Sequence, residues 1–326
     1  MKKNVLYRFH KEIIITTILL LSICSARAQQ YPRDTSYSIH SAYLKIKKNY
    51  PEVTPITPQK LTTIKEKRDE VYAHVGGRDL TLDVFYPKKK RKGGYPGVIL
   101  VFGGGWSSGS KANQVPMAQK LADAGYVAVV PEYRLSPEIA YPAAVHDLKA
   151  AIRYMRAHAD KYNLDTTQIA SLGCSAGAQL ATLLGVTGDL PKLEGDEGNN
   201  DHSSDIQAIV NIDGIVSFIH PESEEGTYAA RFLGGTRKEA PEIWKEASPL
   251  EYVGPSTPPT LFINSSQPRF HAGRDDMIKI LNDNNIFNQT LTLNDAPHSF
   301  WLVNPWFEPT FKYTVEFLNS VFTKAF

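Results

Sequence analysis

The amino-acid sequence predicts an α/β fold in which helices cover both faces of a mostly parallel sheet. From about residue 97 onward, stretches with helical periodicity alternate with short, strand-like apolar stretches. The run from Gly97 to Phe102 is continuously apolar, which is typical of a strand buried on both faces. Strands that are joined through helices run parallel, so we expect one sheet wrapped on both sides.

The chain before this region contains a predicted hairpin. Residues 70–75 and 80–86 alternate apolar and polar side chains on either side of Gly76-Gly77. A basic run, Lys88 to Lys92, follows the second strand and precedes two further glycines. We interpret this run as a solvated loop between strands rather than as a binding patch.

The later elements alternate along the chain. Strands are expected at residues 126–131, 169–173, 208–212, 260–264 and 288–293. Helices are expected at residues 113–124, 143–162, 176–184 and 311–322. The polar stretches at residues 195–204 and 222–226 are expected to be surface loops beside the later strands.

The N-terminus has the features of an export signal. A basic head precedes an apolar stretch from Ile13 to Cys24, and Ala26-Arg27-Ala28 is a cleavage site of the A-x-A type. The apolar stretch is short for a membrane span. We therefore predict a signal peptide at residues 1–28 and an exported protein, periplasmic or secreted. An uncleaved anchor is the alternative, and lipidation at Cys24 is a minor one.

The rest of the chain is predicted to comprise an extension and one large domain. Residues 29–64 are polar and rich in proline, so we expect an N-terminal extension with little core of its own. Its apolar residues Tyr43, Leu44 and Ile46 are the candidates for docking it. Residues 65–326 are predicted to form a single α/β domain.

Charge and cysteine content restrict the function classes. Cleavage after Ala28 would remove five basic residues and one acidic residue, which changes the formal net charge from +2 to −2. This composition gives no indication of nucleic acid as a partner. Cys174 would be the one cysteine left, so stability has to come from a core. The sequence contains no tight metal-ligand spacing, and we expect neither a metal nor a cofactor.

The stretch Gly173-Cys174-Ser175-Ala176-Gly177 contains the candidate nucleophile. A G-x-S-x-G pattern is weak evidence by itself, but here a predicted strand leads into it and a predicted helix begins at Ala176. The glycines permit a sharp turn that lifts the Ser175 hydroxyl above the carboxyl edge of the sheet. The helix N-terminus would face an oxyanion formed beside Ser175. A structural turn with an ordinary serine is the alternative.

Three glycines in Phe102-Gly103-Gly104-Gly105-Trp106 follow the earlier buried strand. They expose backbone N–H groups without side chains in the way. The N–H of Gly104 or Gly105 would form an oxyanion hole together with that of Ala176. The alternative is a flexible loop, which leaves the coincidence with the serine turn unexplained.

Three blocks of the sequence resemble α/β-hydrolase esterases of the hormone-sensitive-lipase type and of the bacterial feruloyl and acetyl-xylan esterase type. The blocks are FGGGWSSGSK, GYVAVVPEYRLSPEIAYPAAVHDLKAAIRYMRAHADKYNLD and IASLGCSAGAQLA. The resemblance covers about residues 70 to 326. It implies an α/β-hydrolase fold with an eight-stranded, mostly parallel sheet and a catalytic triad in the order Ser, Asp, His. One departure is that Phe102 stands where this family usually has a histidine.

His298, in LNDAPHSFW, is the candidate general base. It follows a predicted strand and precedes the C-terminal helix, where the resemblance places the catalytic histidine. Its distance from Ser175 along the sequence is no obstacle to a triad. A buried structural histidine is the alternative.

The triad acid is harder to assign. The family pattern places an aspartate just after the strand at residues 260–264, but this chain has Ser265-Ser266-Gln267-Pro268 there. Asp213, at the end of the preceding predicted strand, is the favoured residue. Some lipases of this fold carry their acid at that neighbouring strand end.

Other acids stay open at this point. Asp275 and Asp276, in RFHAGRDDM, are the second choice, although carboxylates in the first turn of a helix are also explained by the helix dipole. The remaining alternatives are a Ser–His dyad without an acid and a triad acid supplied by Glu222 or Glu224.

Cations and aromatic residues near these motifs bear on the substrate. Arg269, His271 and Arg274 crowd the loop beside the predicted site. The two arginines could hold a carboxylate-bearing substrate such as a uronate chain, or pair with nearby acids as ordinary surface charge. Flat aromatic faces suit sugar rings, but they equally form pocket wall and core. The aromatic candidates are Trp106, Phe300, Trp301, Trp306 and Phe307.

The segments RFHAGRDDM and HSFWLVNPWFEP resemble a subgroup of exported esterases from polysaccharide-degrading bacteria. The resemblance implies a serine esterase that removes acetyl or methyl esters from plant polysaccharide of the xylan or pectin type. The expected partner is an esterified oligo- or polysaccharide, with no stable membrane span after signal removal. An amidase or peptidase on the same scaffold and a non-catalytic glycan-binding protein are the alternatives.

Overall fold

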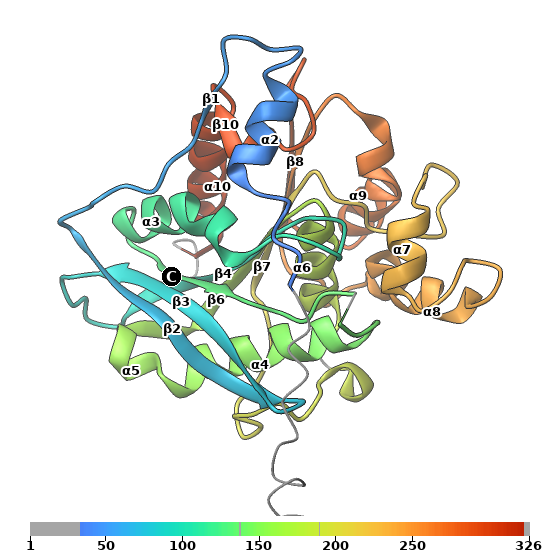
Figure 1. Ribbon diagram of the computed structural model, residues 1–326. Coiled ribbons are helices and arrows are strands. Elements are labelled where there is room, and N and C mark those ends of the chain that lie inside the picture. The colour runs from blue at the N-terminus through green and yellow to red at the C-terminus, as the bar shows by residue number, and fades with distance from the viewer. Residues whose placement is uncertain (1–32, 137, 189, 323–326) are drawn as a thin grey trace, which may run out of the picture.

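The computed structural model describes residues 33–136, 138–188 and 190–322 (Figure 1). The predicted signal peptide at residues 1–28 lies outside these residues, so export stays a prediction. Among the described helices, none has both the length and the apolar character needed to cross a bilayer.

Eight strands form the central sheet. They are β2 Ile64–Val75, β3 Arg78–Pro87, β4 Tyr95–Val101, β5 Val127–Pro131, β6 Leu164–Cys174, β7 Ala208–Ile212, β8 Thr260–Asn264 and β9 Asn288–Thr292. Their order across the sheet is β2-β3-β5-β4-β6-β7-β8-β9. β3 is antiparallel to both β2 and β5, whereas all other neighbouring pairs are parallel. The predicted α/β-hydrolase fold with a mostly parallel sheet is therefore confirmed.

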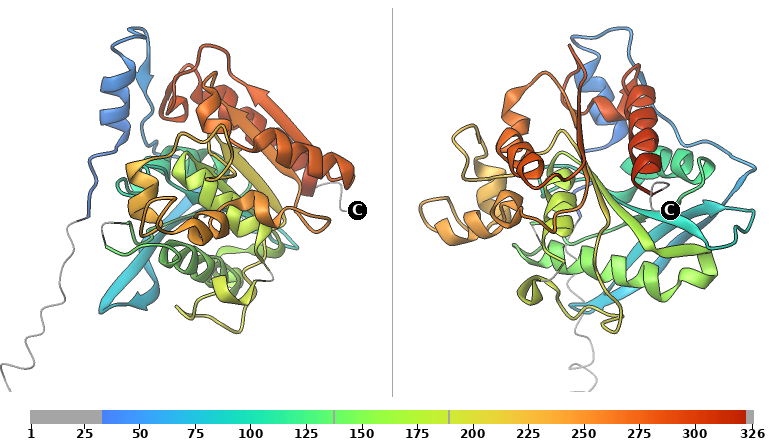
Figure 2. Two further views of the ribbon diagram at one scale, coloured as in Figure 1. Left: turned by 90° about the vertical axis from the view of Figure 1, so that its right-hand side faces the viewer. Right: turned by 180° about the vertical axis from the view of Figure 1, so that it is seen from behind.

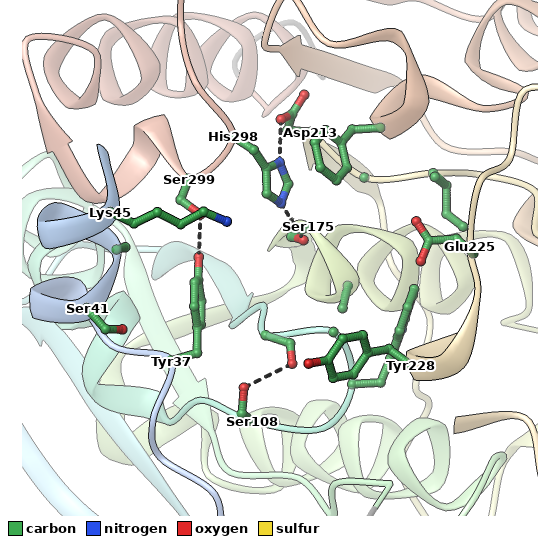
Figure 3. A pocket seen from close by; sticks show the side chains of 18 of the residues that line it. Tyr37, Ser41, Lys45, Ser108, Ser175, Asp213, Glu225, Tyr228, His298 and Ser299 are labelled. Carbon is green, nitrogen blue, oxygen red and sulfur yellow. Dashed lines mark hydrogen bonds and ion pairs between the residues drawn. The ribbon is translucent and has the colours of Figure 1, made fainter. Parts of the chain in front are cut away.

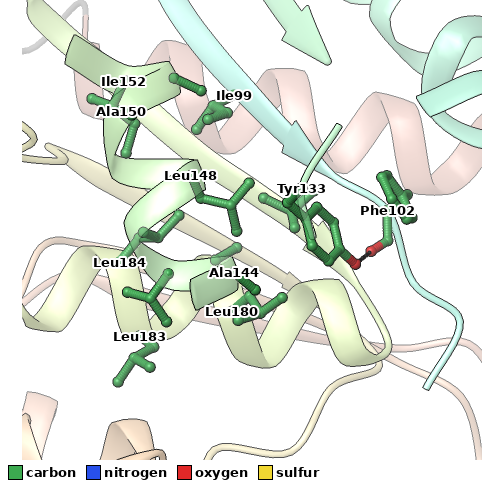
Figure 4. Close-up of a cluster of buried hydrophobic side chains, with 14 of the residues drawn as sticks. Ile99, Phe102, Tyr133, Ala144, Leu148, Ala150, Ile152, Leu180, Leu183 and Leu184 are labelled. Atoms are coloured by element: carbon green, nitrogen blue, oxygen red, sulfur yellow. Dashed lines mark hydrogen bonds between the residues drawn. The ribbon is translucent and has the colours of Figure 1, made fainter. Parts of the chain in front are cut away.

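Alternating side chains of the central strands create two covered faces. In β4, Val98 and Leu100 face one layer while Ile99 and Val101 face the other, and all four are fully buried. The first layer contains α3 Val115–Asp123 and α10 Phe307–Phe322, and the second contains α4 Ala143–Ala157 and α6 Ala176–Val186. Figure 2 shows helices on both sides of the sheet, and Figure 4 shows α4 and α6 packed together beside Ile99.

The structure divides two of the predicted helices. The helix predicted at residues 143–162 is interrupted after α4, and the short helix α5 Ala159–Tyr162 follows before Asn163 takes a left-handed conformation with φ of 58°. The helix predicted at residues 113–124 begins as a 3-10 turn, η1 Lys111–Gln114. Pro116 lies in the first turn of α3, where its missing N–H costs no helical hydrogen bond.

Several short elements had no clear sequence signal. The helices α7 Thr227–Phe232 and α8 Pro241–Glu246 have six residues each, which is too short for helical periodicity to be visible. The helix α9 Arg274–Asp283 was anticipated only through the expected first-turn position of Asp275 and Asp276. The other 3-10 turns are η2 Pro191–Leu193, η3 Pro249–Tyr252, η4 Pro268–His271 and η5 Phe300–Leu302.

The N-terminal extension has more structure than its composition indicated. It contains the helix α2 Ile39–Ile46, which Ser38 and Ser41 cap by exchanging side-chain to backbone hydrogen bonds. It also contains β1 Thr54–Pro55, which pairs with β10 Val303–Asn304 near the C-terminal helix (Figure 1).

Apolar packing holds this extension in place. Ile46, Val53 and Val303 form a small buried cluster of their own. Of the predicted docking residues, Ile46 is buried and Tyr43 is half-buried against this cluster, but Leu44 is 49% exposed and does not serve as an anchor.

Replacing Gly177 by alanine is expected to destabilise the fold, because α6 lies too close to β4 for a side chain. A Cβ there would lie 2.3 Å from the carbonyl oxygen of Val101 and 2.5 Å from that of Phe102. The backbone shift that relieves this contact costs about 1–3 kcal/mol, which a lower unfolding midpoint in urea would reveal. Gly254→Ala is the matched control, since a Cβ there meets nothing within 4 Å. An unchanged midpoint for Gly177→Ala would contradict this reading of the packing.

Candidate active site

The candidate site lies at the carboxyl ends of adjacent parallel strands. Ser175 directly follows β6, Asp213 follows β7, Ser265 follows β8 and His298 lies beyond the end of β9. Because these strands are parallel neighbours, their ends meet at one edge of the sheet. Segments that are more than a hundred residues apart along the chain are thereby brought together.

Ser175 occupies a strained turn between strand and helix. Its φ of 56° and ψ of −125° are unfavourable for a residue with a Cβ, and such strain is typical of functional residues. The turn is sharp because the residues two positions before and after Ser175 are glycines: a Cβ at Gly173 would lie 2.0 Å from the carbonyl oxygen of Gly177. The structure thus has the strand, tight turn and helix that the sequence predicted.

Ser175, His298 and Asp213 form a continuous hydrogen-bonded chain (Figure 3). Nε2 of His298 lies 2.9 Å from Oγ of Ser175, and Nδ1 of His298 lies 2.7 Å from Oδ2 of Asp213. An ionised carboxylate only accepts hydrogen bonds, so Nδ1 carries the proton and Nε2 is free to accept the serine proton. The three residues therefore have the geometry of a nucleophile, a base and an acid.

Asp213 is completely buried, and its environment keeps it ionised. Burial by itself would raise the pKa of this carboxyl, but contacts with His271 and His298 and the N–H of Ser265 outweigh burial and lower the pKa to about 2. Ser265 donates to Oδ1 through both its backbone N–H, at 2.8 Å, and its hydroxyl, at 3.0 Å. Ser265 stands at the position where the family pattern has its aspartate. This position therefore supplies no acid in this chain, and its serine instead donates hydrogen bonds to Asp213, the acid that follows the neighbouring strand.

The other candidate acids pair elsewhere. Asp275 lies 2.8 Å from the guanidinium of Arg274, and Asp276 lies 3.4 Å from Nε2 of His220. Both begin helix α9, as their first-turn placement predicted. The carboxylate of Glu222 also faces His220, and that of Glu224 faces Arg269. The structure thus brings Asp213, and none of these four carboxylates, to His298.

The glycine loop after β4 lies directly against the serine turn. A Cβ at Gly103 would lie 2.5 Å from the carbonyl oxygen of Cys174, so only glycine permits this approach. Gly104 and Gly105 both have positive φ, at 132° and 59°. Together with Ala176, the first residue of α6, they line the cleft beside Ser175. The first N–H groups of a helix have no acceptor within the helix, so that of Ala176 is available to an oxyanion.

Phe102 supports this loop without the histidine that the family usually has. Its ring is fully buried and stacks on Tyr133 with centroids 4.4 Å apart. The Tyr133 hydroxyl donates a hydrogen bond of 2.8 Å to the carbonyl oxygen of Phe102 (Figure 4). Aromatic packing therefore fixes the start of the loop.

A cleft of about 500 Å³ opens beside Ser175. One wall comes from the N-terminal extension, with Tyr37, Ser41 and Lys45 along it (Figure 3). The opposite wall comes from the segment around α7, with Glu225 and Tyr228. Neither wall was expected to bind substrate, because nothing local in the sequence indicates that α2 or α7 reaches the carboxyl edge of the sheet.

The aromatic lining of the cleft differs from the expected one. Phe300, Trp301 and Phe307 are buried in the core, and Trp306 packs edge-on against Tyr50 instead of facing the cleft. Of the two roles that the sequence left open for these four residues, the structure supports packing rather than stacking on sugar rings. Aromatic side chains at the cleft come from Tyr37, Tyr228, Phe270 and Trp106.

Trp106 lines the cleft but is almost fully buried. Its indole stacks on Phe232 with centroids 5.4 Å apart, and its N–H donates to Oε1 of Gln179 at 2.8 Å. Trp106 thus forms the floor of the site rather than an open stacking surface. Tyr228, by contrast, is 61% exposed, and its ring lies 3.6 Å from where a Cβ of Gly105 would be.

The two predicted substrate-binding arginines have different positions. Arg269 lines the cleft, with its guanidinium 3.8 Å from Oε1 of Glu225. Arg274 does not line the cleft: it donates to Oδ1 of Asn264 at 2.9 Å and pairs with Asp275. The expectation that Arg274 binds substrate is therefore corrected, since its charge is directed into the protein.

Cys174, beside the nucleophile, is buried and chemically quiet. Burial raises the pKa of its thiol to about 12, so the reactive thiolate is scarce at neutral pH. Nε2 of Gln114 donates to its sulfur at 3.2 Å. In the described part of the chain, no group of three or more His, Cys, Asp and Glu residues is placed to hold a metal ion.

Comparison with curated proteins gives relatives among esterases. Esterase LipC of Mycobacterium tuberculosis is 33% identical over 192 residues, which are 57% of this chain and 47% of that protein. The probable carboxylic ester hydrolase LipM of the same organism is 26% identical over 258 residues, 75% of this chain and 57% of that protein. The chain thus spans about half the length of these relatives.

Solved structures share the fold. A truncated carbohydrate esterase from gut microbiota has a TM-score of 0.68 at 24% identity, covering 81% of this chain and 100% of that one. A bifunctional GH43-CE protein of Bacteroides eggerthii has a TM-score of 0.67 at 25% identity, covering 80% of this chain and 38% of that one. A thermophilic esterase of Thermogutta terrifontis has a TM-score of 0.66 at 24% identity, covering 81% and 94%.

The sequence profile of the BD-FAE family matches residues 82–280, which is more than half of the chain. This match begins in β3 and ends in α9, so it includes the glycine loop, the serine turn and Asp213. The chain therefore belongs to the BD-FAE family of α/β-hydrolase esterases.

Proposed function

We propose that this protein is an exported serine hydrolase that removes acetyl or methyl esters from plant polysaccharide of the xylan or pectin type. The observation that carries the catalytic part is the hydrogen-bonded chain from Ser175 through His298 to Asp213, with its serine end open to a cleft. Family membership supports ester hydrolysis as the reaction. The basic and apolar N-terminal sequence supports export.

The reaction follows from the roles that the geometry permits. Oγ of Ser175 attacks the ester carbonyl carbon while Nε2 of His298 accepts the hydroxyl proton. The charge that develops on the carbonyl oxygen is held by backbone N–H groups at Gly104, Gly105 and Ala176. The imidazolium then donates its proton to the leaving alcohol, and an acyl-serine remains. Water, deprotonated by the same imidazole, attacks the acyl-serine, releases the acid and restores Ser175.

The shape and lining of the cleft support a sugar substrate. Its volume of about 500 Å³ exceeds what an acetyl group needs, so the alcohol or acid portion of the substrate also fits inside. The exposed ring of Tyr228 and the half-buried ring of Tyr37 offer flat faces on opposite walls. The carbohydrate esterase and the GH43-CE protein among the structural neighbours favour the same class by analogy.

An acidic sugar is favoured by the charges at the cleft. Arg269 is already faced by Glu225, whereas Lys45 is exposed at the cleft and makes no ion pair with the described residues. A uronate carboxylate in a pectin-type chain would give Lys45 a partner. This observation favours pectin over neutral xylan as the polymer.

Purified protein is expected to release acetate or methanol from a panel of acetylated xylan and esterified pectin, and to hydrolyse p-nitrophenyl acetate. A fluorophosphonate probe should label Ser175, and Ser175→Ala should abolish labelling and release. Negligible release from every polymer would refute the polysaccharide assignment. Preferential cleavage of amide substrates would favour an amidase, and failure of the probe to label Ser175 would favour a non-catalytic glycan-binding protein.

Replacing the buried acid by its amide is expected to lower kcat for p-nitrophenyl acetate by about 10⁴, since an uncharged side chain neither fixes the imidazole tautomer nor stabilises the imidazolium. The variant to measure is Asp213→Asn. Asp276→Asn and Asp275→Asn serve as controls. Asp276→Asn should stay within about twofold of the parent rate, and Asp275→Asn, which removes a partner of Arg274, should lose no more than about tenfold. A loss of kcat of about 10⁴ in either control, with Asp213→Asn still active, would show that the triad acid lies in α9 instead.

Lys45→Gln is expected to weaken recognition of acidic sugars. The value of kcat/KM for methyl-esterified pectin should fall about two- to fivefold, which is the range of a partly exposed ion pair, and the difference should shrink in high salt. Hydrolysis of p-nitrophenyl acetate should not change. Lys47→Gln on the same segment is the control, because Lys47 does not line the cleft. Equal values for both variants on pectin would exclude a role for Lys45 in charge recognition.

A further inference from the structure

A second histidine contacts the buried acid from the side opposite to His298. His271 ends the 3-10 turn η4, in the loop that follows β8. Its Nε2 is buried, lies 3.4 Å from Oδ1 of Asp213, and has no well-aligned hydrogen-bond partner within the described part of the chain. The two oxygens of Asp213 thus each face one imidazole, His298 at Oδ2 and His271 at Oδ1.

The neighbour of His271 determines which of its nitrogens carries the proton. Nη1 of Arg274 lies 3.4 Å from Nδ1 of His271. A guanidinium has donors and no acceptor, so Nδ1 must be the unprotonated nitrogen when it accepts from Arg274. The proton of the neutral ring is then on Nε2, which faces Asp213. Arg274 is itself held by Asn264 at the end of β8 and by Asp275 in α9, and these two contacts fix its orientation.

We propose that His271, oriented by Arg274, is a positioning residue that acts through Asp213 on the catalytic base. A chain of polar contacts runs from Arg274 to His271, Asp213, His298 and Ser175, in which the link from His271 to Asp213 is a contact of 3.4 Å and the others are hydrogen bonds. His271 and Ser265 occupy Oδ1 and thereby leave Oδ2 directed at His298. This inference rests on the proposed hydrolytic function, and it gives the RFHAGRDDM segment a role inside the site instead of one in substrate binding.

Phe270, the residue before His271, contacts His298, the partner of Asp213. The ring of Phe270 stacks on the imidazole of His298, with centroids 3.5 Å apart and planes 11° apart. Consecutive residues of one 3-10 turn therefore hold the base and the acid, respectively. A displacement of this turn would change the position of His298 relative to Asp213, which is why the loop contributes to alignment although it lacks the acid.

The arrangement has a consequence for the pH profile. Hydrogen bonds to Oδ1 and the charge of Arg274 draw electron density away from Oδ2. Their removal makes the carboxylate a stronger acceptor for His298, so the imidazolium form is stabilised and the acidic limb of kcat/KM moves to higher pH. The other titratable groups that interact electrostatically with this chain are Tyr37 and Cys174, which interact with Asp213, and Asp275, which interacts with His271.

The experiment compares His271→Ala, His271→Gln and Arg274→Met with the parent enzyme on p-nitrophenyl acetate. We expect kcat to fall about tenfold in His271→Ala at constant KM, the size of a lost polar contact with a buried charged group. The acidic limb should move to higher pH, and His271→Gln, which keeps a donor, should recover part of both effects. The double variant His271→Ala with Arg274→Met should lose little more than His271→Ala, because the residues act in series. His202→Gln, on the loop at residues 195–204, is the control.

The outcomes separate positioning from general structural damage. Parent values of kcat and an unmoved acidic limb in His271→Ala would overturn the proposal. So would a fall in kcat with an unmoved limb and no recovery in His271→Gln, since that pattern is the effect of a packing defect. If His271→Ala does not fold, His271→Gln and Arg274→Met still test the proposal. An acidic limb of kcat/KM at the parent position in both variants would overturn the positioning role.

A readout without substrate distinguishes this inference from the proposed function. The proton between Nδ1 of His298 and Oδ2 of Asp213 gives a low-field proton NMR resonance, which should shift in His271→Ala and in Arg274→Met. If the parent enzyme hydrolyses no ester but the resonance shifts, the proposed function fails and the positioning role stands. An unmoved resonance in both variants, with ester hydrolysis intact in the parent enzyme, would leave the function standing and overturn the positioning role.

Discussion

The rest of the site depends on one buried interaction, the hydrogen bond of 2.7 Å between Asp213 and His298. A carboxylate with no exposed surface is costly unless donors surround it, and here Ser265 and two imidazoles supply them. Their presence keeps Asp213 ionised, which fixes the tautomer of His298 and directs its free nitrogen at Ser175. The loop after β8 has no acid of its own. It instead provides Ser265 and His271, which contact Asp213 after β7 and stabilise its charge.

Close approach of backbones is the second constraint. The glycines of the serine turn and of the loop after β4 lie where a Cβ would collide with a neighbouring carbonyl oxygen. These contacts place Gly104, Gly105 and Ala176 beside Ser175 along the cleft, and the burial of Phe102 on Tyr133 fixes the start of the loop. The N-terminal extension completes the cleft from outside the sheet. The hydroxyl of Tyr37 forms a hydrogen bond of 2.9 Å with the hydroxyl of Ser299, the residue next to His298.

The parts of the molecule that could be predicted are those with a local signal. The strands at residues 208–212 and 260–264 have the predicted bounds, because a short continuous apolar run between polar segments marks both ends. Ser175 and His298 were identifiable from their motifs, and the structure brings them together. The acid was open between Asp213 and the α9 pair, since all three follow strands at the same edge and only packing selects one. The role of the aromatic residues was open as well, because apolar rings near a motif in sequence are equally suited to the cleft and to the core.

The sequence by itself determined the α/β class and the candidate nucleophile, because periodicity and the glycine-flanked turn are encoded within a few neighbouring residues. Its resemblance to α/β-hydrolase esterases implied the α/β-hydrolase fold and the candidate base. Only the tertiary structure decided which carboxylate meets His298, where Arg274 directs its charge and that α2 forms a wall of the cleft. These are contacts between segments far apart along the chain, and they depend on strand order and on which side chains become buried. The physical reason is that burial and electrostatic partners are properties of the packed molecule and leave no pattern in the local sequence.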